Sequence, residues 1–209
     1  MKYPIILIDN GHGTRQHTKG KRSPDGSLIE GEYCRSIALR VANALEEKGL
    51  TVFRLVKEDE DIALSVRAQR VNSYCGRYGA RNVLLVSIHC NAAGNGSQWM
   101  EASGWEVWTT EGKTKSDALA TCLFEAAQET LQGFKMRADK SDGDPDKEKN
   151  FTLLYMAKCP AVLTENLFQD NRGDVAFLLS ETGRKAIVKL HVDGIINYLL
   201  ETGQYVEEK

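Results

Sequence analysis

The sequence predicts an α/β protein, a twisted and mostly parallel sheet with helices on both of its faces. Short apolar runs alternate with segments of helical periodicity along the whole chain. Residues 83–86, Val-Leu-Leu-Val, form one such run, which is typical of a central parallel strand buried on both faces. The 209 residues show no internal repeat and no linker. We therefore expect one domain over residues 1–209, although the length also allows two small ones.

The apolar pattern gives the elements in order. Strands are expected at residues 5–9, 51–56, 83–86, 104–110, 151–155 and 161–164. A helix should begin near Glu30 and end at Gly49, because glycine is a common helix stop. Asp61 should cap the second helix, whose apolar stripe starts at Leu64. Further helices are expected at residues 115–131 and 182–200, with a short segment at residues 174–179 before the last one.

Composition is that of an ordinary soluble globular protein, with 42% hydrophobic and 27% charged residues. The net charge of −2, without a dense Lys/Arg stripe, argues against nucleic-acid binding. No apolar run reaches membrane-span length. The first predicted strand follows Met1 closely, so we expect synthesis in the cytoplasm without a signal peptide. Five scattered cysteines without a C-x-x-C pattern should be reduced and mostly buried, namely Cys34, Cys75, Cys90, Cys122 and Cys159.

Four polar side chains lie where apolar strands end or helices begin. His12 stands between two glycines after the first strand, and His89 closes the central strand. Glu30 opens a helix, and Glu165 ends a later strand. Ligands and reacting groups usually collect at the carboxyl ends of such strands, so we interpret these residues as one site.

The residue types favour a catalytic zinc. Two imidazoles and one carboxylate (His12, Glu30 and His89) leave a fourth position open for water, while Glu165 could act as general base. Structural roles remain open for each residue, because a single histidine after a strand is often only hydrogen-bonded. Glutamate at a helix start is often only capping. Glu32 competes for the position at the helix start, and Asp25 competes as a metal ligand.

Five segments in order resemble the zinc-dependent N-acetylmuramoyl-L-alanine amidases of the amidase 3 type, which cleave peptidoglycan. The segments are residues 8–13 (Ile-Asp-Asn-Gly-His-Gly), 30–38, 64–72, 87–92 (Ser-Ile-His-Cys-Asn-Ala) and 160–171 (Pro-Ala-Val-Leu-Thr-Glu and the six residues after it). Together they span most of the chain. The resemblance implies a phosphorylase/hydrolase-like α/β fold.

The resemblance implies that His12, Glu30 and His89 hold Zn²⁺ and that Glu165 is the catalytic acid/base. The reaction would be hydrolysis of the amide between N-acetylmuramic acid and the L-alanine of the stem peptide in peptidoglycan or muropeptides. The substrate lies outside the cytoplasmic membrane. Release by a phage or prophage would bring the protein to it. Another zinc amidohydrolase or peptidase on the same scaffold, or an inactive cell-wall-binding module, are the alternatives.

The chain departs from the family pattern in two places. A long polar loop, residues 14–29, separates the histidine turn from Glu30, and Asn166-Leu167 replaces a small residue and glycine after the catalytic position. We expect these changes to affect the substrate groove and not the metal ligands. Arg67 and Asn91 are expected to support the site without taking part in catalysis.

Residues outside the site are expected to have ordinary roles. Residues 139–150 should be a mobile surface loop. Its aspartates lack the EF-hand spacing and should form a solvated acidic loop. They are Asp142, Asp144 and Asp146. His191 should be buried on the stripe of the last helix, and His17 should be solvated. Packing is the expected role of Trp99, Trp105 and Trp108.

Overall fold

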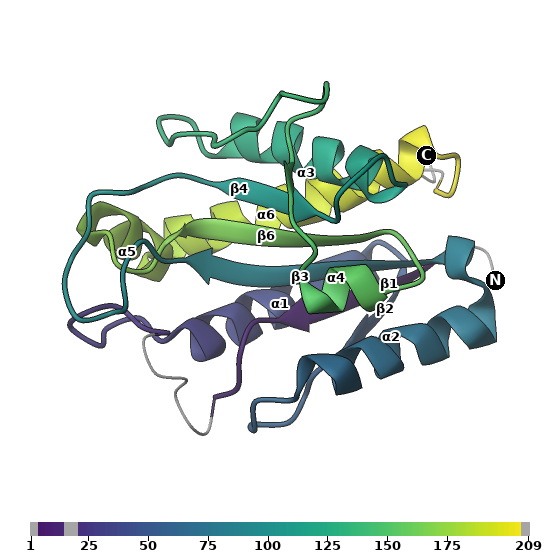
Figure 1. Cartoon of the computed structure of the whole chain (residues 1–209), viewed down its shortest axis with the longest axis horizontal. Helices are drawn as coiled ribbons and strands as arrows, with labels where there is room; N and C mark the ends of the chain where they lie inside the picture. Colours follow the sequence, from purple (N-terminus) through teal and green to yellow (C-terminus); the bar gives the residue numbers. More distant parts are fainter. Residues whose placement is uncertain (1–3, 15–20, 206–209) are drawn as a thin grey trace.

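Six strands form one sheet, in the order β2-β1-β3-β6-β4-β5, in the computed structural model, which describes residues 4–14 and 21–205 (Figure 1). The strands are β1 Ile5–Asn10, β2 Thr51–Arg54, β3 Val83–Asn91, β4 Glu106–Thr109, β5 Lys147–Glu148 and β6 Ala161–Phe168. The first four in the sheet order run parallel, and β4 is antiparallel to β6. The predicted mostly parallel sheet is confirmed.

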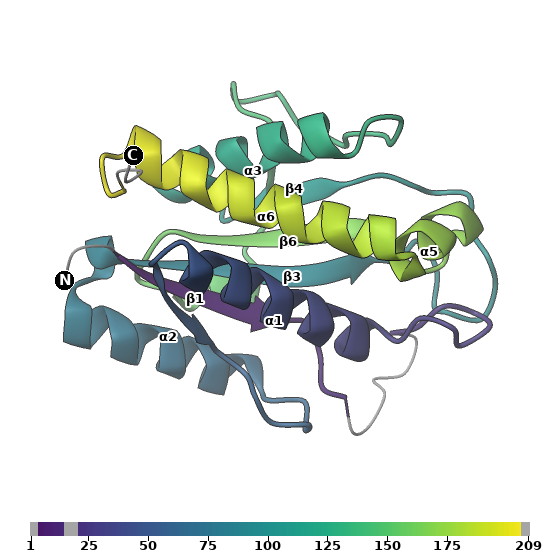
Figure 2. The ribbon, with the colours of Figure 1, turned by 180° about the vertical axis from the view of Figure 1, so that it is seen from behind.

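Helices cover both faces of the sheet, as predicted. Figure 2 shows α1 Glu30–Glu47, α6 Glu181–Glu201 and α3 Ser116–Thr130 over one face. The other face carries α2 Leu64–Tyr78 and α4 Thr152–Met156. Two short helices complete the fold, α5 Arg172–Leu179 beside α6 and the 3₁₀ turn Ala80–Asn82 before β3. No helix in the described part of the chain is long and apolar enough to cross a membrane.

The central strands β1 and β3 begin with four consecutive apolar residues because each strand has two covered faces. In β1, Ile6 and Ile8 pack into the cluster under α1 and α6, whereas Ile5 and Leu7 pack into the cluster under α2. All four side chains are at most 1% exposed. Burying one such side chain stabilises the fold by about 1.5–3 kcal/mol. This burial fixes the position of β1 and therefore of the turn after it, which carries His12.

Residues 151–155 form most of helix α4, so the strand predicted there was wrong. A five-residue apolar run cannot distinguish a strand from a short helix by its periodicity. Leu153 and Leu154 are buried toward α2 and the sheet, while Tyr155 is 69% exposed. Contacts with these neighbours therefore decide the local conformation.

The start of α2 also differs from the prediction. Ala63 is the N-cap residue, and no side chain caps this helix end. Asp61 lies two residues earlier and instead accepts a hydrogen bond from Arg67 at 3.1 Å. Leu64, expected on the apolar stripe, is 49% exposed. The stripe that packs on the sheet begins one turn later, at Ala68.

The acidic loop is not uniformly solvated. Asp142 is exposed, but Asp146 is 2% exposed and accepts a hydrogen bond from Thr109 at 2.5 Å. Burial and the neighbouring Asp144 carboxyl raise the pKa of Asp146 to about 7. Strand β5, which pairs with β4, draws this part of the loop onto the sheet edge. The solvated-loop prediction is therefore wrong for Asp146.

Several other expectations are confirmed. All five cysteines are buried free thiols. His191 is fully buried and satisfied by Thr164 at 2.8 Å and the carbonyl oxygen of Ile187 at 2.7 Å. Trp105 lies in the core. Residue His17 lies outside the described residues.

Candidate metal centre

His12, Glu30 and His89 converge at the carboxyl ends of β1 and β3. One ligand atom from each residue lies within 4.8 Å of the others. The Glu30 Oε1 atom is 3.2 Å from His89 Nδ1 and 3.5 Å from His12 Nε2. Because β1 and β3 are parallel neighbours, their carboxyl ends lie together at one edge, and the start of α1 reaches the same edge. Two nitrogens and one carboxylate oxygen are a donor set that zinc prefers.

The Glu30 carboxylate is completely buried, and its environment keeps it ionised. Its Oε1 atom also faces the Cys90 amide at 3.3 Å, and its Oε2 atom accepts from Gln169 Nε2 at 3.1 Å. Burial opposes ionisation, but the hydrogen bond and charge of His89 outweigh it and lower the Glu30 pKa to about 2. A buried carboxylate held between two imidazoles has its charge ready for a cation.

Glycines allow the backbone to approach the histidines closely. A Cβ atom on Gly11 would lie 2.5 Å from His89 Nδ1, and one on Gly31 would lie 2.1 Å from the Gly13 carbonyl oxygen. His12 has a φ of 60°, which side-chain-bearing residues rarely adopt. Such backbone strain persists only where the surrounding structure enforces it, and it concentrates at functional sites.

Replacing Gly11 by Ala is expected to weaken metal binding by about 10–100-fold, the range seen when the surroundings of a metal ligand are disturbed. The new methyl group would push the His89 imidazole away from Glu30. Competition with a chromogenic chelator measures this change. Gly76→Ala is the matched control, because a Cβ at this position in α2 has no neighbour within 4 Å. Unchanged zinc affinity in Gly11→Ala would contradict the close packing of this turn on His89.

Glu165 stands beside the three residues. It is the register partner of His89 between the parallel strands β3 and β6, so the two side chains share one face of the sheet. Burial is the main cause that raises the pKa of Glu165 to about 8, with a further contribution from the Glu30 charge. Its Oε2 atom is buried and has no hydrogen-bond partner among the residues that the structure describes. An acid whose pKa lies near neutrality is suited to proton transfer.

A bulge directly follows Glu165. The register between β3 and β6 shifts after His89, and Leu167 adopts a φ of 63° while remaining fully buried. Asn166 fixes this bulge by donating to the His89 carbonyl oxygen at 2.9 Å and by accepting from Trp105 at 2.8 Å. At the sequence departure Asn166-Leu167, Leu167 therefore has a left-handed backbone conformation, for which glycine would be the usual residue.

Arg67 and Asn91 have the supporting positions that were expected. Arg67 is 2% exposed, and it binds Asp9 at 2.9 Å and the Asn10 carbonyl oxygen at 2.5 Å. These contacts fix the end of β1 just before His12. Asn91 donates to Glu106 at 2.8 Å.

Neither competing acid belongs to the converging group, and two residues that the sequence did not reveal lie beside Glu30. Asp25 is exposed and binds Ser27, while Glu32 is exposed on α1. Gln169 and Lys21 both approach the Glu30 Oε2 atom, Lys21 with its Nζ atom at 3.8 Å. No spacing pattern connects either of them to Glu30, so only the fold could identify them.

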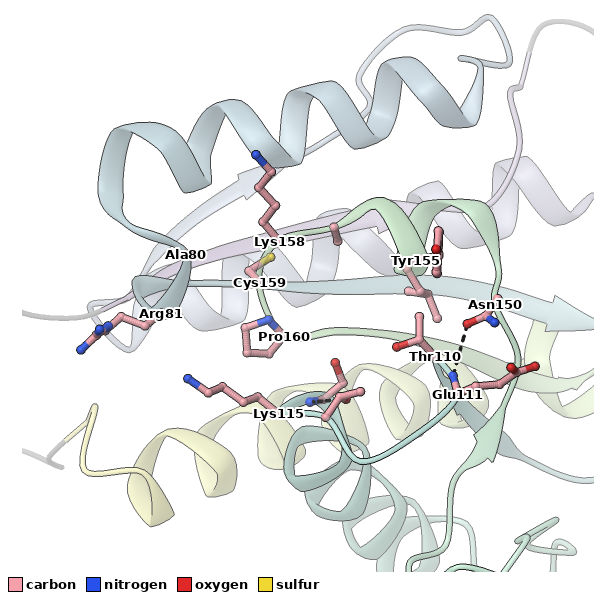
Figure 3. Close-up of a pocket in the computed structure, with 14 residues that line it drawn as sticks. Ala80, Arg81, Thr110, Glu111, Lys115, Asn150, Tyr155, Lys158, Cys159 and Pro160 are labelled. Carbon is pink, nitrogen blue, oxygen red and sulfur yellow. Dashed lines mark hydrogen bonds between the residues drawn. The ribbon is translucent and has the colours of Figure 1, made fainter.

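A cavity of about 400 Å³ lies at the opposite edge of the sheet (Figure 3). It is lined by residues just before β3 and β6, including Arg81 and Pro160, and by Lys115 at the start of α3. The side chains of Arg81 and Lys158 point apart in Figure 3 and form no common charged site. None of the three candidate metal ligands lines this cavity.

Comparisons with known proteins relate the chain to one family. The model of the N-acetylmuramoyl-L-alanine amidase family matches residues 6–197. The endolysin of Bacillus phage SPP1 is 25% identical over 93% of this chain, and the Bacillus licheniformis N-acetylmuramoyl-L-alanine amidase CwlM is 26% identical over 91%. The matches cover 66% of each relative, so the chain spans just under two thirds of their length.

A solved structure shows the same fold over its whole length. The crystal structure of N-acetylmuramoyl-L-alanine amidase from Clostridium difficile 630 superposes with a TM-score of 0.82 at 26% identity. The superposition covers 97% of this chain and 100% of the other. With a family match over residues 6–197, this chain belongs to the N-acetylmuramoyl-L-alanine amidase family.

Proposed function

We propose that this chain is a zinc-dependent peptidoglycan hydrolase that cleaves the amide between N-acetylmuramic acid and the L-alanine of the stem peptide. Residues 1–209 would act as one catalytic domain on the cell wall. Membership of the amidase family supports the reaction, and the donor set of His12, Glu30 and His89 supports zinc.

The residues present fit a bound zinc ion. The Glu30 carboxylate is buried and ionised between two imidazoles, so its charge is directed at the place where a cation would lie. Zinc held by these residues would polarise the substrate carbonyl and lower the pKa of a bound water to about 7. Gln169 orients the Glu30 carboxylate through Oε2 and so leaves Oε1 directed toward the two histidines.

Glu165 would carry the proton in the reaction. Its side chain lies on the same face of the sheet as His89, and its Oε2 atom accepts no hydrogen bond from residues 4–14 or 21–205. It would accept a proton from the water that attacks the carbonyl carbon and then deliver it to the alanine nitrogen as the amide bond breaks. The products are the free lactyl carboxylic acid of the sugar and a stem peptide with a free amino terminus.

One observation carries the proposal, the convergence of three distant segments on a buried carboxylate next to Glu165. The test is mass spectrometry of muropeptides treated with the purified chain, with and without a chelator. We expect release of peptides that begin with L-alanine, and no release after chelation. Cleavage between two peptide residues would instead indicate a peptidase, and cleavage that survives chelation would exclude the metal mechanism.

A further inference from the structure

A basic cavity borders the candidate metal centre. Its volume is about 470 Å³, and it is lined by Lys21, Arg22 and five uncharged residues of segment 92–97. Both charged side chains in the lining are cations. The whole chain has a net charge of −2, so this cavity is a local excess of positive charge.

The cavity lies next to the groups that would act on the substrate. The Lys21 Nζ atom is 3.8 Å from Glu30 Oε2, and the Lys21 carbonyl oxygen accepts from the Glu30 amide at 3.1 Å. On the other side, segment 92–97 directly follows β3, which carries His89. A substrate amide at the metal centre would therefore have this cavity as its neighbour.

Local hydrogen bonds order both walls of the cavity. Arg22 pairs with Ile29 as a β-bridge, and the Ser23 amide donates to the Leu28 carbonyl oxygen at 2.8 Å. In the other wall, the Asp170 carboxylate accepts from the amides of Ala93 and Gly94. A site ordered before binding loses less conformational entropy when a ligand enters.

The cations have charge available for a ligand. Arg22 is exposed, and no ion pair joins it to an acid within residues 4–14 and 21–205. Lys21 is 39% exposed and has Glu30 as its acidic neighbour, a carboxylate that would share its charge with a bound metal. A carboxylate on the substrate is therefore the complementary group.

The substrate of the proposed function carries such a group close to the scissile amide. On the sugar side of the scissile amide, unmodified N-acetylmuramic acid has no ionisable group. On the peptide side, the residue after L-alanine is D-isoglutamate, which is linked through its γ-carboxyl and keeps a free α-carboxylate. An extended residue spans about 3.3–3.6 Å, so this carboxylate lies within about 7 Å of the scissile nitrogen.

Resting on the proposed function, we propose that Lys21 and Arg22 bind this α-carboxylate. The enzyme then selects stem peptides with D-isoglutamate over those in which the same carboxyl is amidated to D-isoglutamine. The two substrates differ by one charge and are nearly identical in shape, so the selection depends on the two cations.

The test compares kcat/KM for two muramyl peptides of equal length that differ only in this carboxyl or amide. We expect the wild-type chain to prefer the acid by about tenfold, with the preference shrinking in 1 M salt. Lys21→Gln and Arg22→Gln should each lower kcat/KM for the acid and bring the ratio toward one. Arg81→Gln removes an equal charge in the distant cavity of Figure 3 and should keep the tenfold ratio.

Binding without turnover separates this proposal from the proposed function. Calorimetry with Glu165→Gln measures the affinity for both peptides directly. The proposal is supported if the Glu165→Gln variant binds the acid peptide more tightly than the amide peptide and the double variant Glu165→Gln with Arg22→Gln does not. This holds even if no cleavage occurs. Equal cleavage and equal binding of the two peptides would overturn it while leaving the amidase function intact.

Discussion

Replacing Glu165 by Gln is expected to lower kcat by about 10²–10⁴-fold, the usual contribution of a general acid or base. The substitution keeps the size of the side chain and its place opposite His89, but the amide cannot accept the proton of the attacking water. Steady-state kinetics on a soluble muramyl peptide measures the loss. Zinc content should stay at the wild-type level, because Glu165 is not one of the three converging ligands.

A second variant makes this result specific. His89→Ala should lose both zinc and activity, which separates a metal ligand from a proton carrier. A further acid near Glu165, apart from the proposed ligand Glu30, is Glu106, its register partner in β4. Its carboxylate already accepts from Arg137 and Lys147, so it cannot easily replace the missing base. Activity within tenfold of wild type in Glu165→Gln would remove Glu165 from the mechanism.

Replacing Arg67 by Met is expected to lower the free energy of unfolding by about 3–5 kcal/mol, because it leaves a buried charge without its partner. Asp9 is 1% exposed, and Arg67 is its cationic partner at 2.9 Å. The Ser87 hydroxyl, which donates to Asp9 at 2.6 Å, cannot neutralise the carboxylate. Urea denaturation monitored by circular dichroism measures the change.

The double variant Asp9→Asn with Arg67→Met should recover part of this loss, since no buried charge remains unpaired. Arg40→Met is the surface control. Its ion pair with Glu181 is exposed on both sides and should contribute about 0–1 kcal/mol. A loss below about 1 kcal/mol in Arg67→Met would show that the buried pair does not hold the end of β1.

Most of the site could be predicted from the sequence, because parallel strands bring the polar residues at their carboxyl ends to one edge of the sheet. His12 follows β1, and His89 lies near the carboxyl end of β3, which is the neighbour of β1 in the sheet. Glu165 stands opposite His89 for the same reason. Glu30 is different, because glutamate at a helix start is usually explained by the helix dipole. Only the family resemblance distinguished it from Asp25 and Glu32.

Tertiary contacts decided the features that the sequence did not predict. The apolar residues of α4 fit a strand as well as a helix until α2 and the sheet cover Leu153 and Leu154. Gln169 reaches Glu30 from 139 residues away and Lys21 from the loop just before α1, and no periodic pattern connects either residue to Glu30. Leu167 takes a left-handed conformation that its side chain disfavours, because the bulge after Glu165 requires it.

The most direct test of the central claim is a zinc titration of the metal-free chain, with release of the muramoyl-linked peptide as the readout. If His12, Glu30 and His89 hold one catalytic ion, activity should be absent at the start and reach its maximum at about one equivalent of zinc per chain. Full activity in the metal-free chain would contradict the account. An unchanged maximal activity in the double variant His12→Ala with His89→Ala would contradict it as well.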